Sequence, residues 1–132
     1  MKVSTKGRYA LIIMINLAKN YENGTYMSLK EISEKENISF KYLEKIIGIL
    51  NKNGYLDVQR GNTGGYKLKN KPEEYTVGEI LRSTEGDLTP TTCLGNHEEC
   101  KVKDKCTVYP FWEGLYSEIN DYVNSKTLKD YI

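Results

Sequence analysis

The sequence is poor in soft metal ligands, because it has only three cysteines and a single histidine. All four lie in one stretch, CLGNHEECKVKDKC, which runs from Cys93 to Cys106. An odd number of cysteines excludes a framework in which every thiol is paired within the chain. Free thiols are typical of reducing compartments, so the cysteine content favours a cytoplasmic protein.

Long hydrophobic runs are also missing. No uninterrupted apolar stretch approaches the roughly 20 residues that a membrane-spanning helix needs. The N-terminus is basic but lacks the apolar core and small-residue cleavage site of a signal peptide. We therefore expect no membrane association and a cytoplasmic location.

Residue patterns that indicate catalysis are absent as well. The sequence shows no nucleophile–base pair, no phosphate-binding loop and no paired carboxylates at a plausible site. We expect that the protein is not an enzyme and has no catalytic residues.

Positive charge is concentrated in the first half of the chain. Residues 1–71 hold 13 Lys and Arg against 6 Asp and Glu, a net charge of +7, whereas residues 72–132 carry −6. Such an asymmetry suggests that the first half faces a polyanion. The alternative is an unevenly charged but merely solvated surface.

Three helices are predicted in this basic half. The stretch KGRYALIIMINLAKNY should form a helix, and it is apolar nearly all round from Tyr9 to Ala18, which is typical of a helix buried on several sides. Ser28 and Glu31 have the spacing of a capping box, so a short helix should run over residues 29–36. After a tight connection, Ser39 can cap a further helix that ends before Gly54.

The last of these helices has a clear division of faces. Its apolar residues recur at i, i+3, i+4 and i+7, which predicts one buried stripe: Leu43, Ile46, Ile47 and Leu50. Two short helices joined by a tight turn indicate a helix-turn-helix.

A β-hairpin should follow directly. In YLDVQRGNTGGYKL, apolar and polar residues alternate on both sides of the glycine-rich turn GNTGG, and Arg60 lies at the tip. A helix-turn-helix followed by a hairpin is a winged helix. The predicted fold is therefore mainly α with a small β-hairpin wing.

This arrangement predicts contacts with double-stranded DNA. The first turns of a recognition helix face base edges in the major groove, and a basic wing can enter the minor groove. The expected recognition-helix contacts are Ser39, Lys41, Tyr42, Glu44 and Lys45. Arg60, beside glycine, suits a narrow minor groove.

The cysteines have the spacing C-x6-C-x5-C. Thiolates bind zinc or iron–sulfur clusters, but a single zinc ion usually favours a closer C-x2–4-C pair. The wide gaps favour a cluster held by Cys93, Cys100 and Cys106, with His97 as the local candidate for a fourth ligand. A zinc site that includes His97 and three unligated thiols remain alternatives.

The end of the chain is predicted to be mostly helical, from Phe111 onward, with an apolar side that needs a partner. A twin subunit would cover it, which predicts a homodimer. We divide the chain into a winged helix-turn-helix DNA-binding domain, residues 1–75, and a cluster-binding loop with a long dimerisation helix, residues 76–132.

Several motifs together resemble the Rrf2 family of bacterial regulators. They are STKGRYAL, SLKEISEKENIS.KYLEKI, RGNTGGYKL, TVGEIL and the three cysteines before FWEGL. The resemblance covers essentially the whole chain. It implies a winged-helix homodimer with crossing C-terminal helices, which binds palindromic operators under the control of an iron–sulfur cluster on the three cysteines.

Within the family, the sequence is most similar to the iron–sulfur cluster regulators, and we expect a [2Fe–2S] rather than a [4Fe–4S] cluster. Some members place a histidine ligand three residues after the last cysteine, where this chain has Tyr109. Others recruit an aspartate from the first helix, but no acidic residue precedes Glu22. Members that regulate cysteine metabolism lack the cysteine triad and fit least well.

The resemblance implies a transcriptional regulator that senses iron–sulfur status or oxidative or nitrosative stress. The alternatives are a zinc- or thiol-based regulator of the same family and a small iron–sulfur electron carrier. A carrier would need neither a wing nor a basic half.

Overall fold

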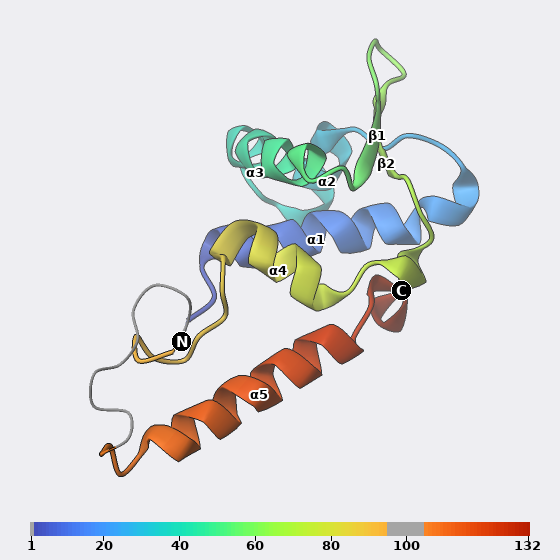
Figure 1. The fold of residues 1–132 in the computed structure, drawn as a ribbon. Coiled ribbons are helices and arrows are strands. Elements are labelled where there is room, and N and C mark those ends of the chain that lie inside the picture. Colours follow the sequence, from blue (N-terminus) through green and yellow to red (C-terminus); the bar gives the residue numbers. More distant parts are fainter. Residues whose placement is uncertain (1, 95–104) are drawn as a thin grey trace.

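The computed structural model describes residues 2–94 and 105–132, and it is mainly helical with one two-stranded hairpin (Figure 1). The predicted fold class is thereby confirmed. His97 and Cys100 lie outside the described residues. In chain order the elements are α1 (Thr5–Lys19), η1 (Tyr21–Asn23), α2 (Leu29–Glu36), α3 (Phe40–Lys52), β1 (Leu56–Gln59), β2 (Gly65–Leu68), η2 (Pro72–Glu74), α4 (Val77–Glu85), α5 (Tyr109–Ser125) and η3 (Leu128–Tyr131).

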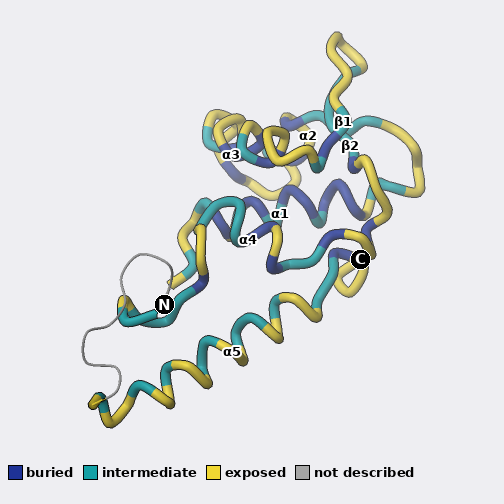
Figure 2. The backbone as a smooth tube through the Cα atoms, in the orientation of Figure 1, coloured by how far each residue is buried: buried dark blue, intermediate teal, exposed yellow. Residues whose placement is uncertain are grey.

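Helix α1 lies at the centre of the core. Its apolar residues Ile13, Met14 and Leu17 are almost completely buried, and α3, α4 and β2 pack around it (Figure 2). The helix starts at Thr5, one residue before the predicted helical stretch, and Ser4 caps it by accepting a hydrogen bond from the backbone N–H of Gly7 at 3.3 Å. The all-round apolar pattern therefore marks a central helix, as expected.

The helix-turn-helix is formed by α2 and α3. The predicted capping box is present, since the backbone N–H of Glu31 donates to Ser28 Oγ at 3.2 Å. Helix α2 ends at Asn37, whose φ of 54° is left-handed and turns the chain sharply toward α3. Ser39 stands at the N-cap position of α3, but its side chain makes no capping hydrogen bond, so that part of the prediction is wrong.

The wing consists of β1 and β2, which pair antiparallel with Val58 opposite Tyr66. Its base is fixed by a further bridge, in which Met27 and Tyr66 exchange two backbone hydrogen bonds of 2.9 and 2.8 Å. Gly65 has a φ of 153°, and any Cβ there would collide with the carbonyl group of Met27. Glycine at this position therefore permits the close approach that anchors the wing.

After α5, the C-terminal segment of the chain returns to the core. Helix α5 ends at Ser125, earlier than the predicted helical tail, because the chain becomes extended at Lys126 and the carbonyl oxygen of that residue accepts a 2.8 Å hydrogen bond from Val77. Leu128 is then fully buried. Helix α5 itself has no buried residue and lies beside the rest of the molecule (Figure 2).

Among the residues that the structure describes, no helix combines the length and the hydropathy required to cross a membrane.

Candidate nucleic-acid interface and cysteine segment

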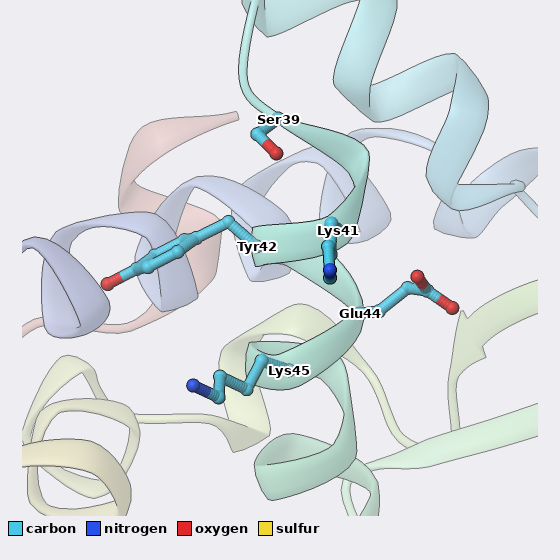
Figure 3. Close-up of a pocket in the computed structure, with 5 residues that line it drawn as sticks. All are labelled: Ser39, Lys41, Tyr42, Glu44 and Lys45. Atoms are coloured by element: carbon cyan, nitrogen blue, oxygen red, sulfur yellow. The ribbon is translucent and has the colours of Figure 1, made fainter.

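The exposed face of α3 carries two lysines one helical turn apart. The five residues predicted for this helix surround one open hollow: Ser39, Lys41, Tyr42, Glu44 and Lys45 (Figure 3). Lys41, Glu44 and Lys45 are exposed, whereas Leu43 and Ile46 point into the core and fix the helix. The structure thus gathers the predicted contact residues on one side of α3.

Tyr42 differs from its neighbours because its ring is partly buried. It packs edge-on against Tyr9 of α1, with ring centroids 5.5 Å apart and an interplanar angle of 87°. Edge-to-face pairs of this kind are favourable and directional. Tyr42 therefore forms a fixed border of the hollow, and α1 positions it.

The wing carries Arg60 directly after β1, and its side chain is exposed. The next residue, Gly61, has a φ of 108°, which L side chains rarely adopt, so the reversal at this point depends on glycine. A second open hollow runs from the wing to the neighbouring helices and includes Arg60, Ser28 and Asn51 in its lining. Sequence reasoning missed Ser28 and Asn51, because only the fold brings them beside the wing.

The exposed cations of α3 and of the wing tip form no ion pairs within the described residues. Within residues 2–94 and 105–132 the structure contains one salt bridge, between Lys129 and Glu73 at 3.3 Å, and both lie away from α3. Lys41, Lys45 and Arg60 have no acidic partner in that part of the chain. Their charge is therefore available to an anionic ligand.

A further cation belongs to the second strand of the wing. The ammonium group of Lys67 lies 4.7 Å from the centroid of the Tyr26 ring. This cation–π contact ties β2 to the segment before α2. Neither residue was predicted as functional, since no local pattern links positions 26 and 67.

Only part of the cysteine segment belongs to the described residues. Cys93 and Cys106 are free, partly buried thiols. No group of three or more potential metal ligands occurs in the described part of the chain, and the predicted ligands Cys100 and His97 lie outside it. Two of the three predicted thiolate donors are therefore placed, and both have the chemistry that a cluster or a zinc ion requires.

The cysteine segment lies between α4 and α5 in the chain, and these two helices are joined by hydrogen bonds. Arg82 of α4 donates to Asn124 Oδ1 at 2.8 Å and to Asn120 Oδ1 at 2.6 Å, both on α5. The hydroxyl of Tyr116 donates to Asp87 at 2.6 Å, and this hydrogen bond, together with burial, raises the pKa of Tyr116. The stretch between α4 and the cysteine segment is thus linked to α5 by a polar contact.

Comparison with known proteins gives a consistent assignment. Residues 3–132 match the family model Rrf2, described as an iron-dependent transcriptional regulator. The chain is 38% identical over 130 residues to the HTH-type transcriptional regulator CymR of Bacillus subtilis, with 98% of this chain and 88% of CymR covered. It is 34% identical over 132 residues to the regulator IscR of Pectobacterium atrosepticum, with 100% and 79% covered.

The fold agrees with these sequence matches. The solved structure of CymR, the global cysteine regulator of B. subtilis, superposes with a TM-score of 0.82 at 35% identity, and covers 99% of this chain and 95% of that one. The overall similarity to IscR is no greater than the similarity to CymR. This chain belongs to the Rrf2 family of winged-helix transcriptional regulators.

Proposed function

We propose that the protein is a homodimeric, cytoplasmic regulator that binds palindromic operators in double-stranded DNA and has no enzymatic activity. Residues 1–75 form the DNA-binding domain, and residues 76–132 form the cluster-binding loop and the dimerisation helix. The observation that carries this proposal is the pair of exposed, unpaired lysines on α3, Lys41 and Lys45, beside a basic wing.

The contacts are assigned by chemistry. Lys41 and Lys45 can donate to guanine or to phosphates, and the carboxylate of Glu44 can accept from cytosine N4. Ser39 and Tyr42 can reach phosphates or base edges at the border of the hollow. Arg60 suits the minor groove next to the half-site.

DNA binding is tested by selecting duplexes from a random library and measuring their affinity by fluorescence anisotropy. Lys41→Ala or Lys45→Ala should weaken binding by about 1–3 kcal/mol where the side chain reads a base. Lys129→Ala, in η3 and away from α3, is the charge-matched control and should bind like the parent protein. If neither α3 substitution changes the affinity at moderate salt, α3 is not the recognition helix.

We further propose that an iron–sulfur cluster, [2Fe–2S] rather than [4Fe–4S], controls promoter binding. Cys93, Cys100 and Cys106 would hold it, with His97 as the candidate fourth ligand. The support is the chemistry of the two described thiols, which are free and partly buried, together with the similarity to IscR. A cluster would supply a redox- and oxygen-sensitive centre, so the regulator would respond to iron–sulfur supply or to oxidative or nitrosative stress.

The cofactor is tested by an anaerobic absorption spectrum of the purified protein with iron, sulfide and zinc counts. Cys100→Ala should abolish stable cluster incorporation. His97→Ala should shorten the lifetime of the cluster or change its spectrum. An unchanged spectrum and lifetime in His97→Ala would remove this residue from the ligand set.

A zinc- or thiol-based regulator is the second candidate, because the fold and sequence are also close to CymR, a cysteine regulator. In that case the same sample would contain zinc or no metal, and sulfide would be absent.

A further inference from the structure

The first residue of α3 is an exposed aromatic side chain that the proposed contacts do not include. Phe40 is 46% exposed. The other large hydrophobic residues exposed in the described part of the chain are Val58, Val108, Phe111, Tyr122, Tyr131 and Ile132. All of them except Val58 lie in or beside α5 or at the C-terminal end. Phe40 and Val58 alone lie on the recognition helix and the wing.

The position of Phe40 restricts what it can contact. It occupies the first turn of α3, directly before Lys41 and one turn before Glu44, and both of these side chains are exposed. The first turn is the part of a recognition helix that reaches base edges. Phe40 therefore lies where Lys41 and Glu44 would meet the major groove.

The chemistry of the phenyl ring further restricts which groups of the DNA Phe40 can contact. A phenyl ring has neither a hydrogen-bond donor nor a strong acceptor, so it cannot use the polar groups of the base edges. The only apolar group that a base pair presents in the major groove is the C5-methyl group of thymine. On the basis of the proposed DNA binding, we propose that Phe40 reads one thymine in each half-site through this methyl group.

A protein partner fits the same side chain less well. A stable protein–protein interface buries at least about 1,000 Å² with an apolar centre. Phe40 is a single ring whose exposed neighbours on α3, Lys41, Glu44 and Lys45, are all charged. An isolated apolar contact beside two exposed lysines suits one methyl group on a polyanion.

The effect is expected to be modest and specific. Loss of one buried methyl group corresponds to an affinity about fourfold weaker. Replacing each thymine of the selected duplex in turn by deoxyuridine removes only this group and leaves the hydrogen-bonding pattern unchanged. The parent protein should lose about fourfold in affinity at one thymine per half-site and little at the others.

The assignment to Phe40 is tested by a double-mutant cycle with the full-length chain. Phe40→Ala should bind the thymine duplex about fourfold or more weakly, and it should bind the thymine and deoxyuridine duplexes equally. Val58→Ala is the matched control, because Val58 is equally exposed at 45%, and it should keep the parent's preference for thymine. Circular dichroism checks that each variant is folded.

Two results would overturn the inference. One is a parent protein whose affinity is insensitive to every thymine methyl group, and the other is a Phe40→Ala variant that keeps the full preference for thymine. If Lys41→Ala still weakens binding in either case, the proposed function stands and only the role of Phe40 is wrong. A parent protein that selects no duplex from the library would remove both proposals.

Discussion

Glu85, the last residue of α4, accepts a hydrogen bond from the backbone N–H of Ser4 at 3.0 Å, and it also accepts from the Ser4 hydroxyl. The carboxylate therefore lies at the N-terminus of α1, where the helix dipole favours negative charge. Gly7 lies beneath it, and a Cβ at that position would collide with the carboxylate. The start of the central helix is thus fixed by a residue 81 positions away.

Removal of this contact should destabilise the fold. Glu85→Ala is expected to lower the free energy of unfolding by about 1–2 kcal/mol, the usual effect of losing a helix cap with a charged acceptor. Gly7→Ala should also destabilise, although alanine favours helices, because it displaces the carboxylate. Urea unfolding measures both effects.

The two substitutions should not be additive. Once Glu85 is alanine, Gly7→Ala no longer meets a carboxylate, and its better helix propensity should stabilise the protein by up to about 1 kcal/mol. Glu113→Ala, on the exposed surface of α5, is the control and should leave the stability unchanged. Additive losses would mean that Gly7 and Glu85 act separately.

The wing should contribute a preference for sequence as well as affinity. Arg60→Ala is expected to weaken binding most on operators whose flanks are rich in A·T pairs, because narrow minor grooves concentrate negative potential. Arg60→Lys keeps the charge and serves as the comparison. Anisotropy titrations on A·T-rich and G·C-rich flanks test this, and an equal loss on both would assign Arg60 to phosphate contacts alone.

Helix α5 should be the dimer contact. Phe111, Leu115 and Tyr122 recur at i, i+4 and i+11, which places them on one side of the helix, and Phe111 and Tyr122 are 63% and 61% exposed. Replacing Phe111 with glutamate should weaken dimerisation by at least about 2 kcal/mol, because it removes apolar area and introduces a charge. Sedimentation equilibrium measures the change. A parent protein that is monomeric at micromolar concentration would contradict the dimer itself.

Stability should fall at alkaline pH through Tyr75. Its buried hydroxyl donates to the carbonyl oxygen of Tyr55 at 2.7 Å and accepts from the N–H of Asn70 at 3.0 Å, and burial raises the pKa of Tyr75 above its usual 10.0. A raised pKa in the folded state means that the stabilisation is complete below pH 10 and is lost as the pH rises through the folded-state pKa.

Tyr75→Phe should therefore lower the stability at pH 7 by about 1–3 kcal/mol, since it leaves the carbonyl oxygen and the N–H without their partner. It should also reduce the further loss above pH 10. Unfolding curves recorded at several pH values for both proteins test this. Parallel pH profiles would show that the pKa of Tyr75 is the same in the folded and unfolded states.

Local sequence signals predicted most of the fold. The capping box of α2 and the buried stripe of α3 depend on residues three or four positions apart, and they were found from spacing alone. The contact of Glu85 with Ser4 at the start of α1 was not predicted, because the two residues are 81 positions apart. The early end of α5 was missed because it depends on pairing of Lys126 with Val77, which no local pattern indicates.

In the candidate site, too, local patterns were predicted from the sequence and contacts between separate elements were not. Lys41 and Lys45 were identified because both belong to one helix and are a single turn apart. The packing of Tyr42 on Tyr9 and the position of Asn51 beside the wing depend on contacts between separate elements. Cysteine spacing indicated the chemistry of the ligands, but it does not determine how the chain brings them together.

Because Leu128 is buried, the C-terminal end of α5 is anchored, and a rotation about this end moves the N-terminal end of the helix furthest. With 17 residues at 1.5 Å each, the helix is about 25 Å long. Its C-terminal end is held next to the core, and its other end begins three residues after Cys106. A rotation of only about 10° about the held end would displace Tyr109 by about 4 Å on this geometry. A small rearrangement of the Arg82 hydrogen bonds near the anchored end would therefore cause a larger displacement at Cys106. Conversely, a displacement at Cys106 would reach α4 as a much smaller rotation.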